Sequence, residues 1–144
     1  MIVDVNAYLV TNGNGQEAVK FYEDALNAEV LFLQTFGEMP EDPNHPIPDE
    51  AKDRVMNAQF KVGNNLMMLS DTFPGMPYNL GNQVTIALQI DKAENAKKVF
   101  EKLSVGGKVT MELQETFWSP MYGQVTDKFG VDWQVSTIKE DEKR

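Results

Sequence analysis

The sequence has 144 residues, of which 42% are hydrophobic and 24% charged, as in an ordinary single-domain globular protein. Twenty-two acidic against 13 basic residues give a net charge of −9, which excludes the basic surface that nucleic acids and anionic membranes require of their partners. Cysteine is absent, no apolar run reaches the ~20 residues of a membrane span, and the start lacks the basic region of a signal peptide, so a cytoplasmic protein without disulfides is expected.

The first half of the chain is expected to fold as one strand, one helix and three further strands. Residues 2–10 are rich in Val, Ile, Leu and Tyr and predict a strand. A helix is predicted over 16–26, where Asn14 and Glu17 have the spacing of a capping box and the apolar residues share one helical face: Ala18, Phe21, Tyr22 and Ala25. A proline-rich acidic segment, 38–53, predicts a long loop. The remaining strands are expected over 28–36, 54–62 and 65–70.

The second half repeats this order. Asp91 with Glu94 predicts the start of a helix that ends at Gly106-Gly107, and its apolar face is expected to contain Ala93, Ala96, Phe100 and Leu103. Strands are expected over 83–90, 108–113, 122–130 and 131–138. Residues 16–23 align with 94–101, and three of the eight aligned residues are identical: Ala18/Ala96, Lys20/Lys98 and Glu23/Glu101. The pattern predicts an internal duplication.

The predicted fold class is therefore α+β. Two βαβββ modules, 1–72 and 82–138, are expected to form a single domain over 1–144, with a frayed tail at 139–144. Two small curved sheets side by side would enclose a cleft, which is a natural site for a small molecule. Residues 13–18 also match the loose glycine pattern of dinucleotide-binding loops. Three strands without intervening helices favour a tight turn and a helix start there instead.

Three segments carry a family resemblance: 8–26, 55–71 and 115–135. The last is the most specific, with Phe117-Trp118, Tyr122-Gly123 and the run Asp127 to Trp133. The sequence resembles the PhnB-like branch of the vicinal oxygen chelate superfamily, which includes glyoxalase I, bleomycin-resistance proteins and extradiol dioxygenases. The resemblance implies paired βαβββ modules and a homodimer.

The superfamily's usual chemistry uses a divalent metal held by His and Glu side chains from four strands. By the resemblance, those four positions fall at Ala7, Met68, Thr85 and Gln134. None of the four is a His or a carboxylate, so a metal is possible but disfavoured and no other cofactor is expected. Asn57 stands where PhnB-like relatives commonly have a His, and an amide cannot take a proton at neutral pH.

A metal-free, polar and aromatic cleft is therefore predicted. It would bind a small organic molecule through Asn57, Gln59, Met68, Thr85, Trp118, Tyr122, Gln124 and Gln134. Such binding would serve either sequestration or a reaction whose catalytic residues the sequence does not identify. The alternative is a metal-dependent lyase, isomerase or dioxygenase of the glyoxalase type with non-standard ligands. His45, the single histidine, is expected to be exposed in the 38–53 loop, with a lid over the cleft as its alternative role.

Overall fold

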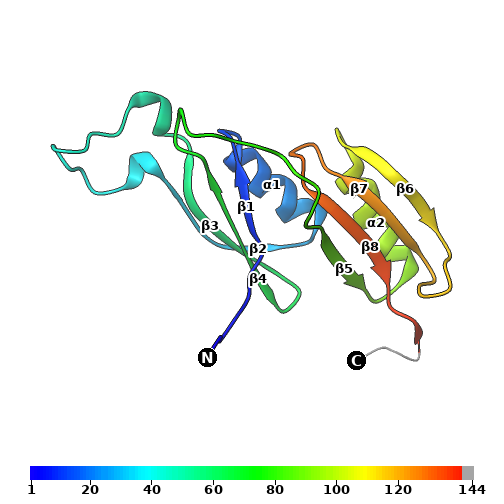
Figure 1. The fold of residues 1–144 in the computed structure, drawn as a ribbon. Helices are drawn as coiled ribbons and strands as arrows, with labels where there is room; N and C mark the ends of the chain where they lie inside the picture. The colour runs from blue at the N-terminus through cyan, green and yellow to red at the C-terminus, as the bar shows by residue number, and fades with distance from the viewer. Residues whose placement is uncertain (141–144) are drawn as a thin grey trace. The chain divides into compact units, whose positions relative to one another are not determined.

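The computed structural model describes residues 1–140 and contains two compact units. The first spans Met1–Asn79 and the second begins at Leu80. Each unit has the order strand, helix, strand, strand, strand, so the α+β class and the two βαβββ modules are confirmed (Figure 1). Of the predicted frayed tail, residues 141–144 lie outside the described residues.

Unit 1 is a four-stranded sheet with the strand order β1-β4-β3-β2. The pair β1–β4 is parallel and the other pairs are antiparallel. Its elements are β1 (Tyr8–Thr11), α1 (Gly15–Ala25), β2 (Glu29–Thr35), β3 (Val55–Val62) and β4 (Asn65–Asp71). Strand β1 is shorter than the predicted 2–10, because its ladder with β4 begins at Tyr8 and residues 1–5 are exposed.

Unit 2 repeats this topology with the strand order β5-β8-β7-β6, and its parallel pair is β5–β8. Its elements are β5 (Ile86–Ile90), α2 (Ala93–Ser104), β6 (Lys108–Gln114), β7 (Tyr122–Thr126) and β8 (Asp132–Thr137). The predicted strand 83–90 is shortened at its start, where Val84 is exposed and unpaired. Each helix packs on one face of its own sheet and leaves the other face open (Figure 1).

The predicted helix faces form the core of each unit. Ala18 and Ala96, aligned in the sequence repeat, are both fully buried. In unit 1 the ring of Tyr22 stacks on Phe60 of β3 at 6.0 Å between centroids. In unit 2 Phe100 is 5% exposed, and burial of such a side chain contributes about 1.5–3 kcal/mol to stability.

Asn14 is the N-cap residue of α1, as predicted, but the predicted capping box is not formed. The Asn14 side chain accepts no hydrogen bond from α1. The Asp71 carboxylate, at the end of β4, instead accepts from the backbone N–H of Gly13 at 2.7 Å and of Gly15 at 3.0 Å. A carboxylate at the positive end of a helix is favourable, and a strand contributed by another part of the chain supplies it here. In a dinucleotide-binding loop such amides would donate to a phosphate. Here they donate to the Asp71 carboxylate, which favours the tight turn and helix start over the dinucleotide-binding loop.

The cap residue of the second helix lies one residue after Asp91, where it was predicted, so this predicted cap is wrong. Lys92 is the N-cap residue of α2, and no side chain caps the helix. The Asp91 carboxylate accepts instead from the side-chain amide of Asn95 at 3.0 Å, which lowers the pKa of Asp91. The first turn of α2 therefore lacks the carboxylate that α1 receives from its sheet.

The described residues, 1–140, include no helix with the length and apolar character that crossing a membrane requires.

Candidate functional site

The open faces of the two sheets carry predicted site residues at equivalent positions, as one pair on each sheet. In unit 1 Gln59 lies opposite Met68, and in unit 2 Gln124 lies opposite Gln134. Met68 and Gln134 each stand three residues before the last residue of their strand, so the two pairs match. Asn57, two residues before Gln59, therefore corresponds to Tyr122.

In unit 2 four predicted residues form one chain of hydrogen bonds. The Gln124 amide donates to the Tyr122 hydroxyl at 3.1 Å, and that hydroxyl donates to the Gln134 carbonyl. The Gln134 amide then donates to the Thr85 hydroxyl at 2.8 Å. Thr85 is exposed, so the chain runs from the middle of the sheet to a solvent-accessible hydroxyl.

Trp118 lies beside this polar chain. Its ring makes an edge contact with Tyr122, with 5.2 Å between ring centroids, and the residue is 45% exposed. A short turn holds it there, because Thr116 N–H donates to the Ser119 carbonyl at 2.9 Å. Ser119 is fully buried and its hydroxyl donates to the Thr137 carbonyl at 2.8 Å, which fixes the turn to β8. The half-exposed indole is thus available for stacking on a ligand.

Unit 1 holds a smaller network at the equivalent place. The Gln59 amide donates to the Asn57 carbonyl at 3.2 Å, and the Asn57 amide donates to the Tyr8 hydroxyl at 3.4 Å. Tyr8 also lies opposite Met68 in the parallel ladder and is 48% exposed. Sequence reasoning missed Tyr8, although its position in the ladder with β4 places it on the same face as Gln59.

The four positions that the resemblance assigns to a metal are Ala7, Met68, Thr85 and Gln134, and none of them is a His or a carboxylate. Within unit 2, Thr85 and Gln134 are hydrogen-bonded to one another. Within unit 1 the register makes Asn6, and not Ala7, the counterpart of Thr85, and the Asn6 amide donates to a carbonyl of β4. Amide, hydroxyl and thioether groups are poor anchors for a hard divalent ion. Residues 1–140 contain no group of three or more His, Cys, Asp or Glu side chains that could hold a metal.

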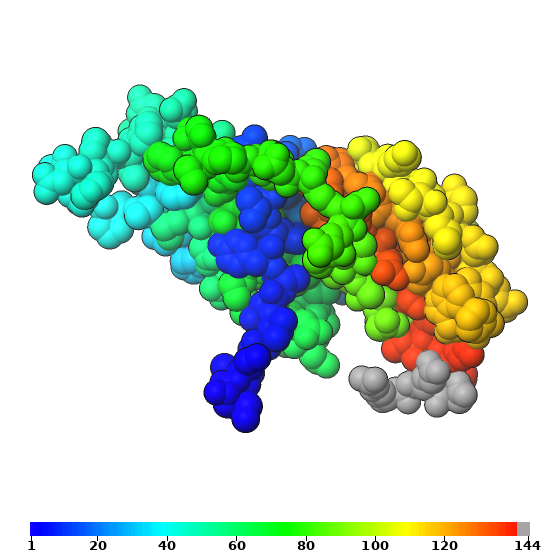
Figure 2. Space-filling model, in the orientation of Figure 1, coloured from blue at the N-terminus to red at the C-terminus, as the bar shows by residue number. Residues whose placement is uncertain are grey.

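His45 lies in the predicted loop, which extends from unit 1 as the cyan to teal segment in Figure 2. Its side chain is 84% exposed and its Nδ1 lies 3.0 Å from a carboxylate oxygen of Asp42. That hydrogen bond lowers the pKa of Asp42. Short 3-10 turns lie at the start of the loop, at Phe36–Glu38, and within its last part, at Asp49–Ala51. His45 thus forms a hydrogen bond within its own loop, and its alternative role as part of a lid stays a prediction.

Known proteins share the sequence and the fold. The model of the Glyoxalase/Bleomycin resistance protein/Dioxygenase superfamily matches residues 4–135. Protein YjdN of Escherichia coli is 34% identical over 145 residues, covering 94% of this chain and 96% of YjdN. Protein PA1353 of Pseudomonas aeruginosa has a TM-score of 0.85 and 34% identity, with 96% of this chain and 100% of that one covered.

The PhnB protein of Bacillus cereus has the same fold, with a TM-score of 0.76 and 23% identity over 94% of this chain and 99% of that one. The duplicated topology, the positions of the sequence repeat and the match over residues 4–135 agree with one another. The chain therefore belongs to the glyoxalase/bleomycin resistance protein/dioxygenase superfamily and resembles its PhnB-like members.

Proposed function

We propose that the protein binds a small organic molecule on the open face of unit 2, without a resident metal. The observation that carries this proposal is the hydrogen-bonded chain from Gln124 through Tyr122 and Gln134 to Thr85, next to the half-exposed ring of Trp118. Amide and hydroxyl groups can both donate and accept, so they suit a neutral polar ligand. The indole adds a flat apolar surface for the ligand's carbon frame.

Charge supports a neutral ligand as well. The five residues of this surface are uncharged: Thr85, Trp118, Tyr122, Gln124 and Gln134. A phosphonate or another strong anion would find no cation among them, in a chain whose net charge is −9. Asn57, Gln59 and Met68 form the corresponding surface of unit 1, and these three residues are uncharged as well.

Native mass spectrometry tests the proposal on protein purified from its own cells without chelator or metal affinity. We expect an organic adduct on the wild-type protein and on a Gln16→Leu control, which changes an exposed glutamine of helix α1 in the other unit. Gln134→Leu should lose the adduct, because it removes the hydrogen bonds to Tyr122 and Thr85. A wild-type spectrum without an organic adduct would contradict binding. One divalent ion per chain would favour the metal-dependent lyase, isomerase or dioxygenase.

The same spectrum gives the subunit number, for which we propose a homodimer in the cytoplasm. Tyr8, Val10 and Phe32 are each between 45% and 49% exposed, which is a large apolar exposure for one sheet. A second copy would cover such side chains, and two-fold dimers are the commonest assemblies. The chain mass is 16.2 kDa, so the expected main species has about twice that mass, and a monomer would contradict the proposal.

A further inference from the structure

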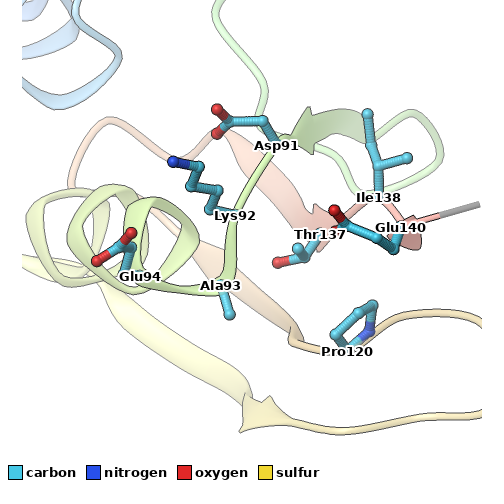
Figure 3. Close-up of a pocket in the computed structure, with 8 residues that line it drawn as sticks. All are labelled: Asp91, Lys92, Ala93, Glu94, Pro120, Thr137, Ile138 and Glu140. Atoms are coloured by element: carbon cyan, nitrogen blue, oxygen red, sulfur yellow. The ribbon is translucent and has the colours of Figure 1, made fainter. Parts of the chain in front are cut away.

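A surface pocket of about 560 Å³ opens at the N-terminal end of α2 (Figure 3). Ala93 from the helix, Pro120 from the turn before β7 and Thr137 from β8 are among the residues that line it. Side chains alternate along a strand, so Thr137 points to the opposite face of β8 from Gln134. The pocket is therefore separate from the polar surface proposed above.

The internal duplication shows what this place holds in the other module. Asp71 ends β4 in register with Thr11, and Thr137 ends β8 in register with Ile90. Asp71 and Thr137 are thus equivalent, and both are buried, with 5% and 3% exposed. In module one the Asp71 carboxylate fills the space at the helix start, and in module two a shorter hydroxyl side chain leaves it open.

Two sets of hydrogen-bonding groups at this open space have no hydrogen-bond partner among residues 1–140. The Thr137 hydroxyl is buried and has no hydrogen-bond partner among the described residues. Figure 3 shows it directed toward the start of α2. The first amides of α2, at Ala93 and Glu94, have no intrahelical acceptor, and no side chain caps this helix. Their counterpart at Gly15 donates to Asp71.

The charges around the pocket restrict the ligand further. Asp91, Glu94 and Glu140 contribute three carboxylates to the lining, against the single ammonium of Lys92. A simple anion gains from the helix amides but is repelled by these side chains. A ligand with a carboxylate next to an ammonium group is attracted by both features: the helix amides attract its carboxylate, and the acidic side chains attract its ammonium group.

We propose that this pocket binds the carboxylate of a small zwitterion of the α-amino acid class. The ligand carboxylate takes the place that Asp71 has in module one, accepting from the Thr137 hydroxyl and from the α2 amides. The ligand ammonium faces the acidic lining.

Titration of ¹⁵N-labelled protein with glycine tests this at constant pH and ionic strength, with acetate and methylamine as single-charge probes. We expect glycine to shift the amide signals of Ala93 and Glu94, acetate to bind more weakly, and methylamine to leave these signals unmoved. Thr137→Val keeps the side-chain shape and should weaken glycine binding about fivefold or more, because it removes one hydrogen bond to a charged group.

Two further variants distinguish ligand binding from structural damage. Thr137→Ser retains a hydroxyl and should retain glycine binding, and Thr110→Val, an exposed matched change on β6, should leave it unaltered. The proposal is overturned if glycine moves no signal at the start of α2. It is also overturned if Thr137→Val, folded as judged by its spectrum, binds glycine like the wild type. Equal binding of acetate and glycine would refute the zwitterion class.

Discussion

Replacing Asp71 with Asn tests how module one is held together. The buried Asp71 carboxylate accepts from the hydroxyl of Thr11 and from the N–H groups of Gly13, Gly15 and Val55, at 2.7–3.0 Å. An asparagine side chain keeps one acceptor oxygen but presents an NH₂ group to the remaining donors. Three of the four donors reach Oδ1 and the Val55 N–H reaches Oδ2, so an asparagine that keeps its oxygen at the Oδ1 position loses the bond from Val55. Hydrogen bonds to a charged group contribute about 1.5–3 kcal/mol each, so we expect a loss of about 1.5–3 kcal/mol in the free energy of unfolding.

The assay is urea unfolding followed by far-ultraviolet circular dichroism, because both tryptophans, Trp118 and Trp133, lie in unit 2 and report on that unit. Amide exchange should accelerate most at Val55, whose N–H loses its acceptor at Oδ2. Asp53→Asn, the same change at an exposed position, should alter the free energy by no more than about 0.5 kcal/mol. A loss of less than about 1 kcal/mol for Asp71→Asn would refute the reasoning.

Two further predictions concern packing and titration. Gly107→Ala should lower the free energy of unfolding by about 2–3 kcal/mol in urea titrations, because its Cβ would collide with the backbone carbonyl of Thr126, whereas Gly81→Ala, with open space around it, should be nearly neutral. The His45 hydrogen bond lowers the pKa of Asp42, so any stability from the pair is present above the pKa of an unfolded Asp and is lost as pH falls through the lowered value. Carboxyl ¹³C titration should show the Asp42 pKa rising in His45→Ala, and an unchanged pKa would contradict the contact.

The topology was predictable because it depends on periodic features of the sequence. Ala96, Phe100 and Leu103 recur at helical spacing, and all three are buried as predicted, whereas Ala93 is only half-buried. Helix caps depend on contacts between distant segments, which periodicity does not contain. Asp71 lies 56 residues from the amide of Gly15 that it caps, so no local pattern indicates the pair.

The polar surface of unit 2 was predictable in its residue types but not in its hydrogen bonds, and its role as a binding site stays a proposal. Glutamines within strands indicated a polar face, and the structure joins Gln124 and Gln134 through Tyr122. The register that makes this chain continuous became visible only with the strand pairing, as did the part played by Tyr8 in unit 1. That the two open faces line one cleft stays a prediction.

Comparing equivalent positions in the two modules distinguishes residues that the fold requires from residues that are available for ligand binding. Where both modules need the same packing, equivalent positions keep the same character, as at Ala18 and Ala96. Where they differ, the fold tolerates either residue, so the difference is free to serve binding. Met68 corresponds to Gln134 on the open faces, and in module two the hydrogen-bonded chain continues through Gln134 to Thr85. A ligand that binds to this chain would therefore bind the two modules unequally, although their topology is the same.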